Sequence, residues 1–519
     1  MSTDQQGQNR FGLLALIVAG ATIGTDFTGA LLLVPGIEET FRADITTTQW
    51  VLNIYALVFA MLMVAGGKLG DTFGRVNTLR IGLVIFIASS VICLVSPTMP
   101  VLLAGRALQG IGAGLIWPNL IGTAAMIVPE ARRGVSIGMI LAAVTSGNVI
   151  GPLMSGAIMQ FADWRLFFGI NVALAALAFL MCTLFLSKTR VERPPERVDF
   201  LGIATLGLAV LAVLLALDVG SQWGWQSPRL LTLIGAGIVL FILFPFVEMW
   251  VKDPMVPPRW LAQRQFCLFL AINGMMMPAV FTGFLYFPQY LQKVLGWSDL
   301  NTSFGMVPMM GTLAITSVVT GYVYVRTGPK PILIFGGVIA ILGCIGIILI
   351  HEAWGYLSLM VPMMLIALGG ASKVGPAGTA TVSLVPQESA ALASGLAFMA
   401  HLVIGAIGLA GATAVLNATS LSTLGNKLSA DNIQISQTDL TALNAADPTS
   451  SRSLQILSQF DAATADKVQT AMREAFEVGL IHAYWLALAL VAIGLLLVLV
   501  VNGRTEDSKL LDPPEAEQP

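Results

Sequence analysis

The chain has 519 residues, of which 56% are hydrophobic and only 11% are charged, whereas a soluble domain carries roughly 25% charged residues. Runs of about twenty apolar residues, enough to cross a hydrocarbon layer as a helix, recur along the whole sequence. The formal net charge of −2 gives no reason to expect binding to nucleic acid. The composition therefore excludes a soluble protein and predicts an all-α, polytopic membrane protein.

The first apolar run begins at Phe11, is longer than a signal peptide and lacks a small-residue cleavage site, so we interpret it as a retained span. Apolar runs bounded by charged or Gly/Pro/Asn-rich turns predict fourteen transmembrane helices in the order six, two, six. They cover residues 11–35, 50–70, 78–96, 101–127, 134–159, 166–187, 200–219, 229–250, 266–291, 302–325, 331–350, 357–384, 389–415 and 479–501. The expected domains are a six-helix bundle (1–190), a two-helix insertion with linkers (191–264), a second six-helix bundle (265–503) and a tail (504–519).

Lysine and arginine predict the orientation, because cytoplasmic loops are enriched in them. With the N-terminus in the cytoplasm, the inner segments hold 17 of the 27 Lys and Arg residues and the short outer loops hold four. Four more lie in segment 416–478, and long loops follow the rule poorly. We therefore expect both termini in the cytoplasm.

Segment 416–478 is polar, and helical periodicity emerges toward its end. The periodic apolar residues are Leu454, Ile456, Leu457, Phe460, Val468, Met472 and Phe476. Two interpretations remain open: an amphipathic lid at the outer surface, or a mostly disordered loop with one helix that continues into the last span.

The turn between the second and third spans reads GGKLGDTFGRVNTLR, residues 66–80. Its glycines allow two helix ends to approach closely, and Asp71 and Arg75 are four residues apart, where opposite charges can pair. The turn resembles the major facilitator superfamily signature G-x-L-x-D-x-x-G-R, which Gly67, Leu69, Asp71, Gly74 and Arg75 match. A degenerate copy follows in residues 321–330, without the acid, and resembles the repeat of the family's two six-helix halves.

Four further stretches resemble motifs of the drug:proton antiporters in this family. They are WVLNIY (50–55), AGRALQGIGAG (104–114), GNVIGPLMSG (147–156) and DWRLFFGIN (163–171). Together with fourteen spans, they are similar to the fourteen-helix branch, over nearly the whole chain. The resemblance implies two six-helix bundles around a central cavity, with two inserted helices, and export of drugs by alternating access in a prokaryotic inner membrane. It implies a proton gradient as the energy source and no cofactor, with small molecules, protons and membrane lipids as partners, and it is compatible with a monomer.

The fifth-span motif contains Gly147, Gly151, Pro152 and Gly156. Small residues permit close helix contact, and proline weakens the backbone hydrogen-bond ladder so that the helix can bend. In the family this motif is associated with exporters. Simple tight packing is the alternative.

Charged residues inside membrane spans are costly and point to function. Asp26 lies in the first span and Arg106 in the fourth. A buried carboxyl group can alternate between binding a proton and attracting a cationic substrate. Asp26, followed nine residues later by Pro35, resembles the branch's first-helix pattern, and in the family the fourth-helix arginine is thought to assist proton coupling by contacting the first helix. A purely structural salt bridge between Asp26 and Arg106 is the alternative.

Lys373 in the twelfth span and His401 in the thirteenth are the other polar candidates. Lys373 is interpreted as a counter-ion for Asp26 or another acid, as a contact for anionic or zwitterionic cargo, or as a side chain that reaches the inner surface. His401 is interpreted as a proton relay or as a structural hydrogen-bond donor. Asp218 and Glu248 lie near the ends of the inserted helices, where we expect them at the membrane surface.

The leading hypothesis is a proton-coupled exporter of amphipathic, cationic drugs. An exporter of an endogenous metabolite, a lipid or an anionic antibiotic is the alternative within transport, and Lys373 is the feature that would favour it. A non-transporting sensor or an enzyme is the alternative from another class. The sequence contains no P-loop, zinc-ligand spacing or nucleophile elbow, so we expect neither an enzyme nor a metal site.

Overall fold

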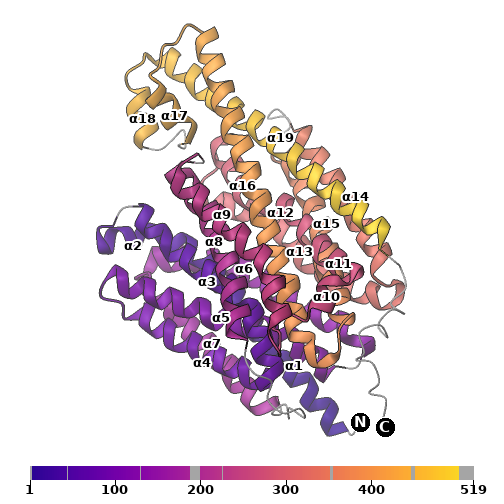
Figure 1. Ribbon diagram of the computed structural model, residues 1–519. Helices are drawn as coiled ribbons and strands as arrows, with labels where there is room; N and C mark the ends of the chain where they lie inside the picture. Colours follow the sequence, from indigo (N-terminus) through magenta and orange to yellow (C-terminus); the bar gives the residue numbers. More distant parts are fainter. Residues whose placement is uncertain are drawn as a thin grey trace, which may run out of the picture.

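The computed structural model describes residues 3–43, 45–128, 130–186, 199–224, 226–350, 355–445 and 451–501. These residues form helices joined by short turns, and strands are absent from the described part (Figure 1). Among the described residues, fourteen helical segments are long and apolar enough to span a membrane, which confirms the number of spans predicted from the sequence. Helix α1 begins and helix α19 ends on the same side of the molecule, here named the terminus side (Figure 1).

The helices follow the order six, two, six. The first half consists of α1 (Thr3–Gly29) with η1 (Ala30–Leu33) and α2 (Val34–Phe41), α3 (Ile45–Phe73), α4 (Arg75–Leu94), α5 (Met99–Ile127), α6 (Glu130–Phe161) and α7 (Arg165–Phe185). The insertion consists of α8 (Phe200–Trp223) and α9 (Pro228–Trp250), and α10 (Pro258–Ala262) follows in the linker. The second half consists of α11 (Arg264–Met275) with α12 (Met277–Lys293), α13 (Asp299–Thr327), α14 (Pro329–Ile348), α15 (Tyr356–Ser383), α16 (Ala390–Ala430), α17 (Gln437–Ala445), α18 (Ser451–Leu457) and α19 (Ala462–Val500).

Two spans are interrupted where proline enters. Pro35 follows the 3-10 turn η1, and Pro278 follows the junction of α11 and α12. Proline has no backbone N–H and clashes with the preceding helical turn, so it is best accommodated at the start of a new helical segment. Each interruption therefore falls where the sequence removes a hydrogen bond.

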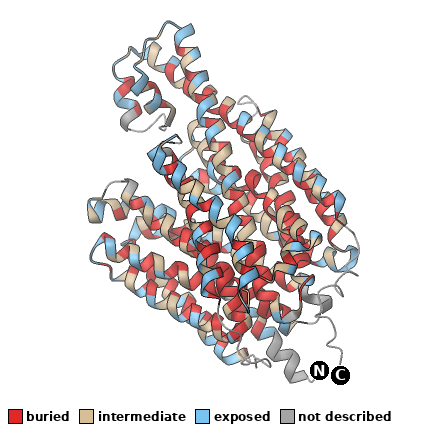
Figure 2. Ribbon diagram, in the orientation of Figure 1, coloured by how far each residue is buried: buried red, intermediate tan, exposed pale blue. Residues whose placement is uncertain are grey.

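Buried residues line the faces along which helices meet, whereas α9 presents mostly half-buried and exposed side chains (Figure 2). Phe246 and Ile242 of α9 are exposed. In a membrane protein such apolar residues face lipid, which accepts them without cost. The hydrophobic sequence thus serves both the interior and the lipid-facing surface.

The two halves meet closely toward the terminus side. An added Cβ on Gly67 of α3 would lie 2.6 Å from the Ala391 carbonyl oxygen of α16, and Gly138 of α6 similarly abuts the backbone of Ser317 in α13. Toward the opposite side the apolar clusters are separate: one around Phe167 is made by the first half, and one around Tyr290 by the second. This conformer is therefore closed on the terminus side.

Segment 416–478 forms a helical projection on the side opposite the termini (Figure 1). Helices α16 and α19 extend beyond their expected span ends and, with α17 and α18, enclose an apolar core that includes Leu424, Val468 and Met472. The prediction of a mostly disordered loop is wrong, because most of the segment is helical, whereas the helix expected to continue into the last span is confirmed as α19. The periodic apolar residues pack mainly in the projection's own core, and a role as a lid at the outer surface stays a prediction.

Candidate functional site

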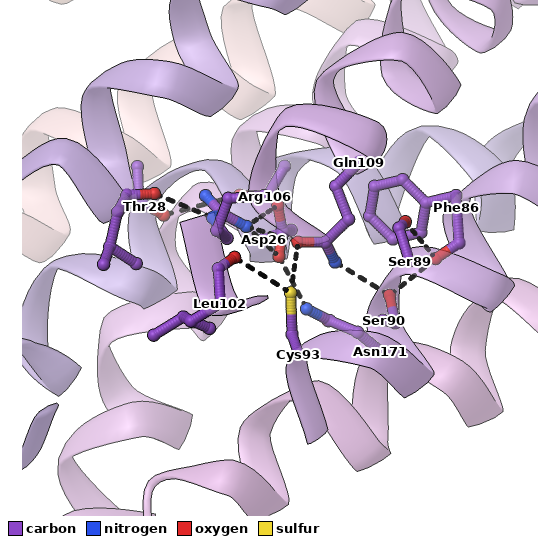
Figure 3. A network of polar contacts seen from close by, with 12 residues as sticks. Asp26, Thr28, Phe86, Ser89, Ser90, Cys93, Leu102, Arg106, Gln109 and Asn171 are labelled. Carbon is purple, nitrogen blue, oxygen red and sulfur yellow. Dashed lines mark hydrogen bonds and ion pairs between the residues drawn. The ribbon is translucent and has the colours of Figure 1, made fainter. Parts of the chain in front are cut away.

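A buried ion pair joins α1 and α5 inside the first half (Figure 3). Arg106 Nη1 donates to both carboxylate oxygens of Asp26, at 3.0 Å to Oδ1 and 2.9 Å to Oδ2. Both side chains have 0% exposure. Removing two charges from water is costly, and the attraction between them offsets that cost only where further hydrogen bonds satisfy both groups.

Those further hydrogen bonds come from three other helices and from Gln109 of α5. Asn171 of α7 donates to Asp26 Oδ1 at 2.7 Å, and Arg106 Nε donates to the Val51 carbonyl of α3 at 2.8 Å. Gln109 accepts from Arg106 Nη1 at 2.8 Å and donates to Ser90 of α4 at 2.8 Å (Figure 3). Five helices thus hold the pair in one orientation.

Sequence reasoning named the two charges but assigned no role to Gln109 or Asn171. Gln109 stands three residues after Arg106, almost one helical turn further along α5, and Asn171 ends the DWRLFFGIN stretch. A polar residue on the same helix face as a buried charge was the available signal for Gln109. Nothing in the spacing of Asn171 indicated its contact with α1.

The signature turn connects the two halves. Arg75 Nε donates to Asp71 Oδ1 at 2.7 Å, and Arg75 Nη1 donates to the Gly122 carbonyl at 3.0 Å. Asp71 Oδ2 in turn accepts from the backbone N–H of Leu392 at 2.8 Å. Leu392 lies in the first turn of α16, where backbone N–H groups lack helical partners and favour an anion. We call this contact between Asp71 and the α16 N-terminus the latch.

Gly74 and Gly67 of the same turn are required for different reasons. Gly74 has φ 97°, a conformation that glycine adopts without the strain caused by a side chain. Gly67 lies against the α16 backbone and has no room for a Cβ. Gly74 makes the turn, and Gly67 allows the two halves to approach each other.

The fifth-span motif packs α6 against the segment of α1 that carries Asp26. Added Cβ atoms on Gly147 and Gly151 would lie 2.5 Å from the carbonyl oxygens of Ala21 and Thr25. Pro152 lies inside α6. The nearest atom to a Cβ on Gly156 would be 3.8 Å away. Close packing therefore accounts for the first two glycines and not for the third.

His401 lies in an aromatic setting apart from the ion pair. Its ring stacks on Phe398 at 4.8 Å and meets the edge of Phe281 at 5.7 Å. The side chain is 8% exposed, and Nδ1 has no hydrogen-bond partner among the described residues. The structure does not pair His401 with Asp26.

Lys373 of α15 is fully buried between α14 and α19. Its Nζ lies 3.1 Å from the ideal Cβ position of Gly337 and 3.7 Å from that of Gly494. Within the described part of the chain, Nζ has neither an ion pair nor a hydrogen bond. The interpretation as a counter-ion for Asp26 is wrong, because Arg106 has that role, and the complete burial also contradicts a side chain that reaches the membrane surface.

The acids of the insertion were expected at the membrane surface, and the structure corrects this for Glu248. Glu248 is 1% exposed and accepts from the Val256 N–H at 3.0 Å, so its predicted surface position is wrong. Asp199 caps α8 and accepts from the Met255 N–H at 3.1 Å. Both carboxylates bind the linker that leads into the second half, and backbone donors explain their burial. Asp218 is half-buried and accepts from Asn53 of α3 at 2.7 Å.

Comparison with known proteins identifies the family to which this chain belongs. The model of the Major Facilitator Superfamily matches residues 15–409. The chain belongs to the Major Facilitator Superfamily.

Within the described residues, no group of three or more His, Cys, Asp or Glu side chains is placed to hold a metal ion.

Relatives in this superfamily include named resistance and export proteins. The chain is 27% identical to the tetracenomycin C resistance and export protein of Streptomyces glaucescens, over 80% of this chain and 76% of that protein. It is 32% identical to the methylenomycin A resistance protein of Bacillus subtilis, over 60% and 67% of the two chains. It is 28% identical to the multidrug resistance protein Stp of Mycobacterium tuberculosis, over 80% and 78%. These relatives indicate a transporter of small molecules and not an enzyme.

Solved structures of superfamily members share the fold. The proton:xylose symporter XylE aligns with a TM-score of 0.58 at 14% identity, over 98% of this chain and 99% of that chain. The human organic anion transporter MFSD10 aligns with a TM-score of 0.57 at 15% identity, over 94% and 99%. The all-α major facilitator fold expected from the sequence is confirmed.

Proposed function

We propose that the protein exports amphipathic, cationic drugs or toxic compounds across the cell (inner) membrane in exchange for protons. The buried pair of Asp26 and Arg106 is the observation that carries this proposal, because it is a carboxyl group placed to gain and lose a proton inside the membrane. Drug export is supported by the relatives, and the distribution of Lys and Arg supports cytoplasmic termini. A monomer is the proposed functional unit, surrounded by membrane lipids.

The closed terminus side suggests how the cycle proceeds. If this side faces the cytoplasm, the conformer has its cytoplasmic side shut and held by the latch of Asp71 to α16. A proton arriving from outside neutralises Asp26 and removes the charge that holds Arg106. Movement of α1 is transmitted to α6 through the contacts at Gly147 and Gly151. Cargo leaves outward, and loss of the proton to the cytoplasm resets the pair.

The substitution Asp26→Asn tests this proposal in liposomes. Efflux of ethidium driven by an imposed pH gradient should be lost, because Asn cannot carry the proton, while the protein remains folded. Asp163→Asn is the matched control, since Asp163 forms an exposed pair with Arg165 that water can replace. Gradient-driven efflux by Asp26→Asn at the wild-type rate would overturn proton coupling at this residue.

A further inference from the structure

A row of aromatic rings runs from the ion pair in the first half to His401 in the second. The guanidinium of Arg106 lies 4.4 Å from the centre of the Tyr55 ring. Tyr55 is 5.9 Å from Phe59, Phe59 is 6.4 Å from Phe398, and Phe398 is 4.8 Å from His401. Phe27, Trp117 and Phe281 flank the row at 6.2 Å from Tyr55, 4.1 Å from Phe398 and 5.7 Å from His401. We call these seven rings the aromatic row.

The ion pair itself is closed to cargo in this conformer. Asp26 and Arg106 have 0% exposure, and Asn171 occupies one oxygen of the carboxylate. The aromatic row is exposed in part: Phe27 is 41% exposed and Phe398 and Phe281 are half-buried, whereas Tyr55, Phe59 and Trp117 are 1–3% exposed. This conformer therefore presents the rings of Phe27, Phe281 and Phe398 in part, while the carboxylate of Asp26 is fully buried.

Tyr55 is the only ring of the row that also contacts the ion pair by a cation–π interaction. Its hydroxyl group and Arg106 Nη2 are both buried without a hydrogen-bond partner among the described residues. The contact between the two side chains therefore rests on the ring face rather than on the hydroxyl group. A shift of the guanidinium must move this ring or lose the contact with it.

We propose that the aromatic row binds planar, aromatic, cationic cargo, and that Tyr55 is the positioning residue that couples this cargo to the charge state of Asp26. This inference rests on the proposed function. Flat polycyclic compounds stack on aromatic side chains, and a positive charge on them is attracted to the ring faces. Protonation of Asp26 releases Arg106, the Tyr55 ring moves with the guanidinium, and the surface on which cargo stacks is disrupted. Binding of cargo and protonation of Asp26 thus weaken each other, although cargo does not contact the carboxylate.

Two measurements on purified protein in detergent separate binding from coupling. Ethidium, a planar aromatic cation, is titrated by fluorescence, and the protons released per bound ethidium are read with a pH-sensitive dye. Tyr55→Leu should bind ethidium about three- to tenfold more weakly, as expected for one lost ring stack, and should release few or no protons. Tyr55→Phe keeps the ring and should behave as wild type. Wild-type proton release by Tyr55→Leu, or its loss in Tyr55→Phe, would overturn the coupling role.

Phe398→Leu gives a second test that leaves the contact with Arg106 intact. It should weaken ethidium binding to a similar extent while the protons released per bound ethidium stay unchanged. Dodecyltrimethylammonium, a cation without rings, is attracted to ring faces but cannot stack on them, so its binding should weaken less than that of ethidium in both leucine variants. Equal weakening for both probes would overturn the preference for planar aromatic cargo. Loss of coupling in Asp26→Asn concerns the proposed function alone, so the two proposals can fail separately.

Discussion

Each half of the transporter buries a cation, and the two cations are treated differently. Arg106 in the first half is bound by a carboxylate, a backbone carbonyl and an amide. Lys373 in the second half lies against glycines, and no partner for its Nζ is present among the described residues. Burial alone therefore does not identify a coupling site. What distinguishes the first half is a network that fixes the charge in place.

The largest expected effect comes from removing Arg106. The variant Arg106→Met leaves the Asp26 carboxylate buried without its counter-ion, and should lower the free energy of unfolding by about 3–5 kcal/mol. Unfolding by denaturant in detergent measures the change. Arg165→Met is the control, because its pair with Asp163 is partly exposed and worth only about 0–1 kcal/mol. Equal losses in both variants would contradict the importance of the network.

Next in size is a change in the packing around the first-half site. Gly151→Ala brings a Cβ to 2.5 Å from the Thr25 carbonyl oxygen, and such overpacking should cost about 1–3 kcal/mol. Gly156→Ala is the matched control, since its Cβ would meet nothing closer than 3.8 Å. Thermal unfolding of the two variants compares them. A similar melting temperature for both would show that α1 and α6 are not closely packed in the membrane.

Replacing Lys373 should have the opposite sign. Lys373→Met removes an unsatisfied buried amine and should raise the free energy of unfolding by about 1–2 kcal/mol. Lys330→Met is the control, because the Lys330 Nζ donates to the carbonyls of Leu499 and Val501 at 3.1 and 2.8 Å, and its loss should destabilise. If Lys373→Met destabilises the protein as much as Lys330→Met does, Lys373 has a stabilising partner and the contrast with Arg106 is wrong.

The smallest effect concerns an acid in water rather than in the membrane. Asp461 caps α19, and hydrogen bonds donated by Thr464 lower its pKa below the ordinary value of 3.8. Because the pKa is lower in the folded state, the carboxylate stabilises the cap at pH above 3.8, and this stabilisation is lost as the pH falls through the folded pKa. Hydrogen exchange in the first turn of α19 should accelerate over that range. Asp461→Asn, which also caps helices well, should show no such acid response.

The sequence predicted the spans because lipid imposes a simple rule of length and hydrophobicity. It also indicated Asp26 and Arg106, because an ionisable residue stands out in an apolar run. The proposed domain boundaries at 190, 264 and 503 stay a prediction. Nothing tests them beyond the order of the helices.

Contacts between distant segments are what the sequence did not reveal. The partner of Asp71 is a backbone N–H of Leu392, and a backbone group leaves no mark on composition. Glu248 was misplaced because its position near a helix end was read without the linker that folds back on it. Lys373 was assigned partners because a buried cation normally needs one. Each error concerns which residues meet in the folded protein rather than which segments form helices.

The projection gains a mechanical meaning from the length of α16. This helix begins beside the latch and runs for 41 residues into the projection without an assigned break, a distance of about 60 Å at 1.5 Å per residue. A continuous helix of that length transmits a force applied at the projection to the Asp71 contact at its other end. A molecule bound at the tip, such as an antibody fragment or a neighbouring protein, therefore exerts a force on the latch at the other end of the helix. Transport should therefore be sensitive to load at a point remote from cargo and proton.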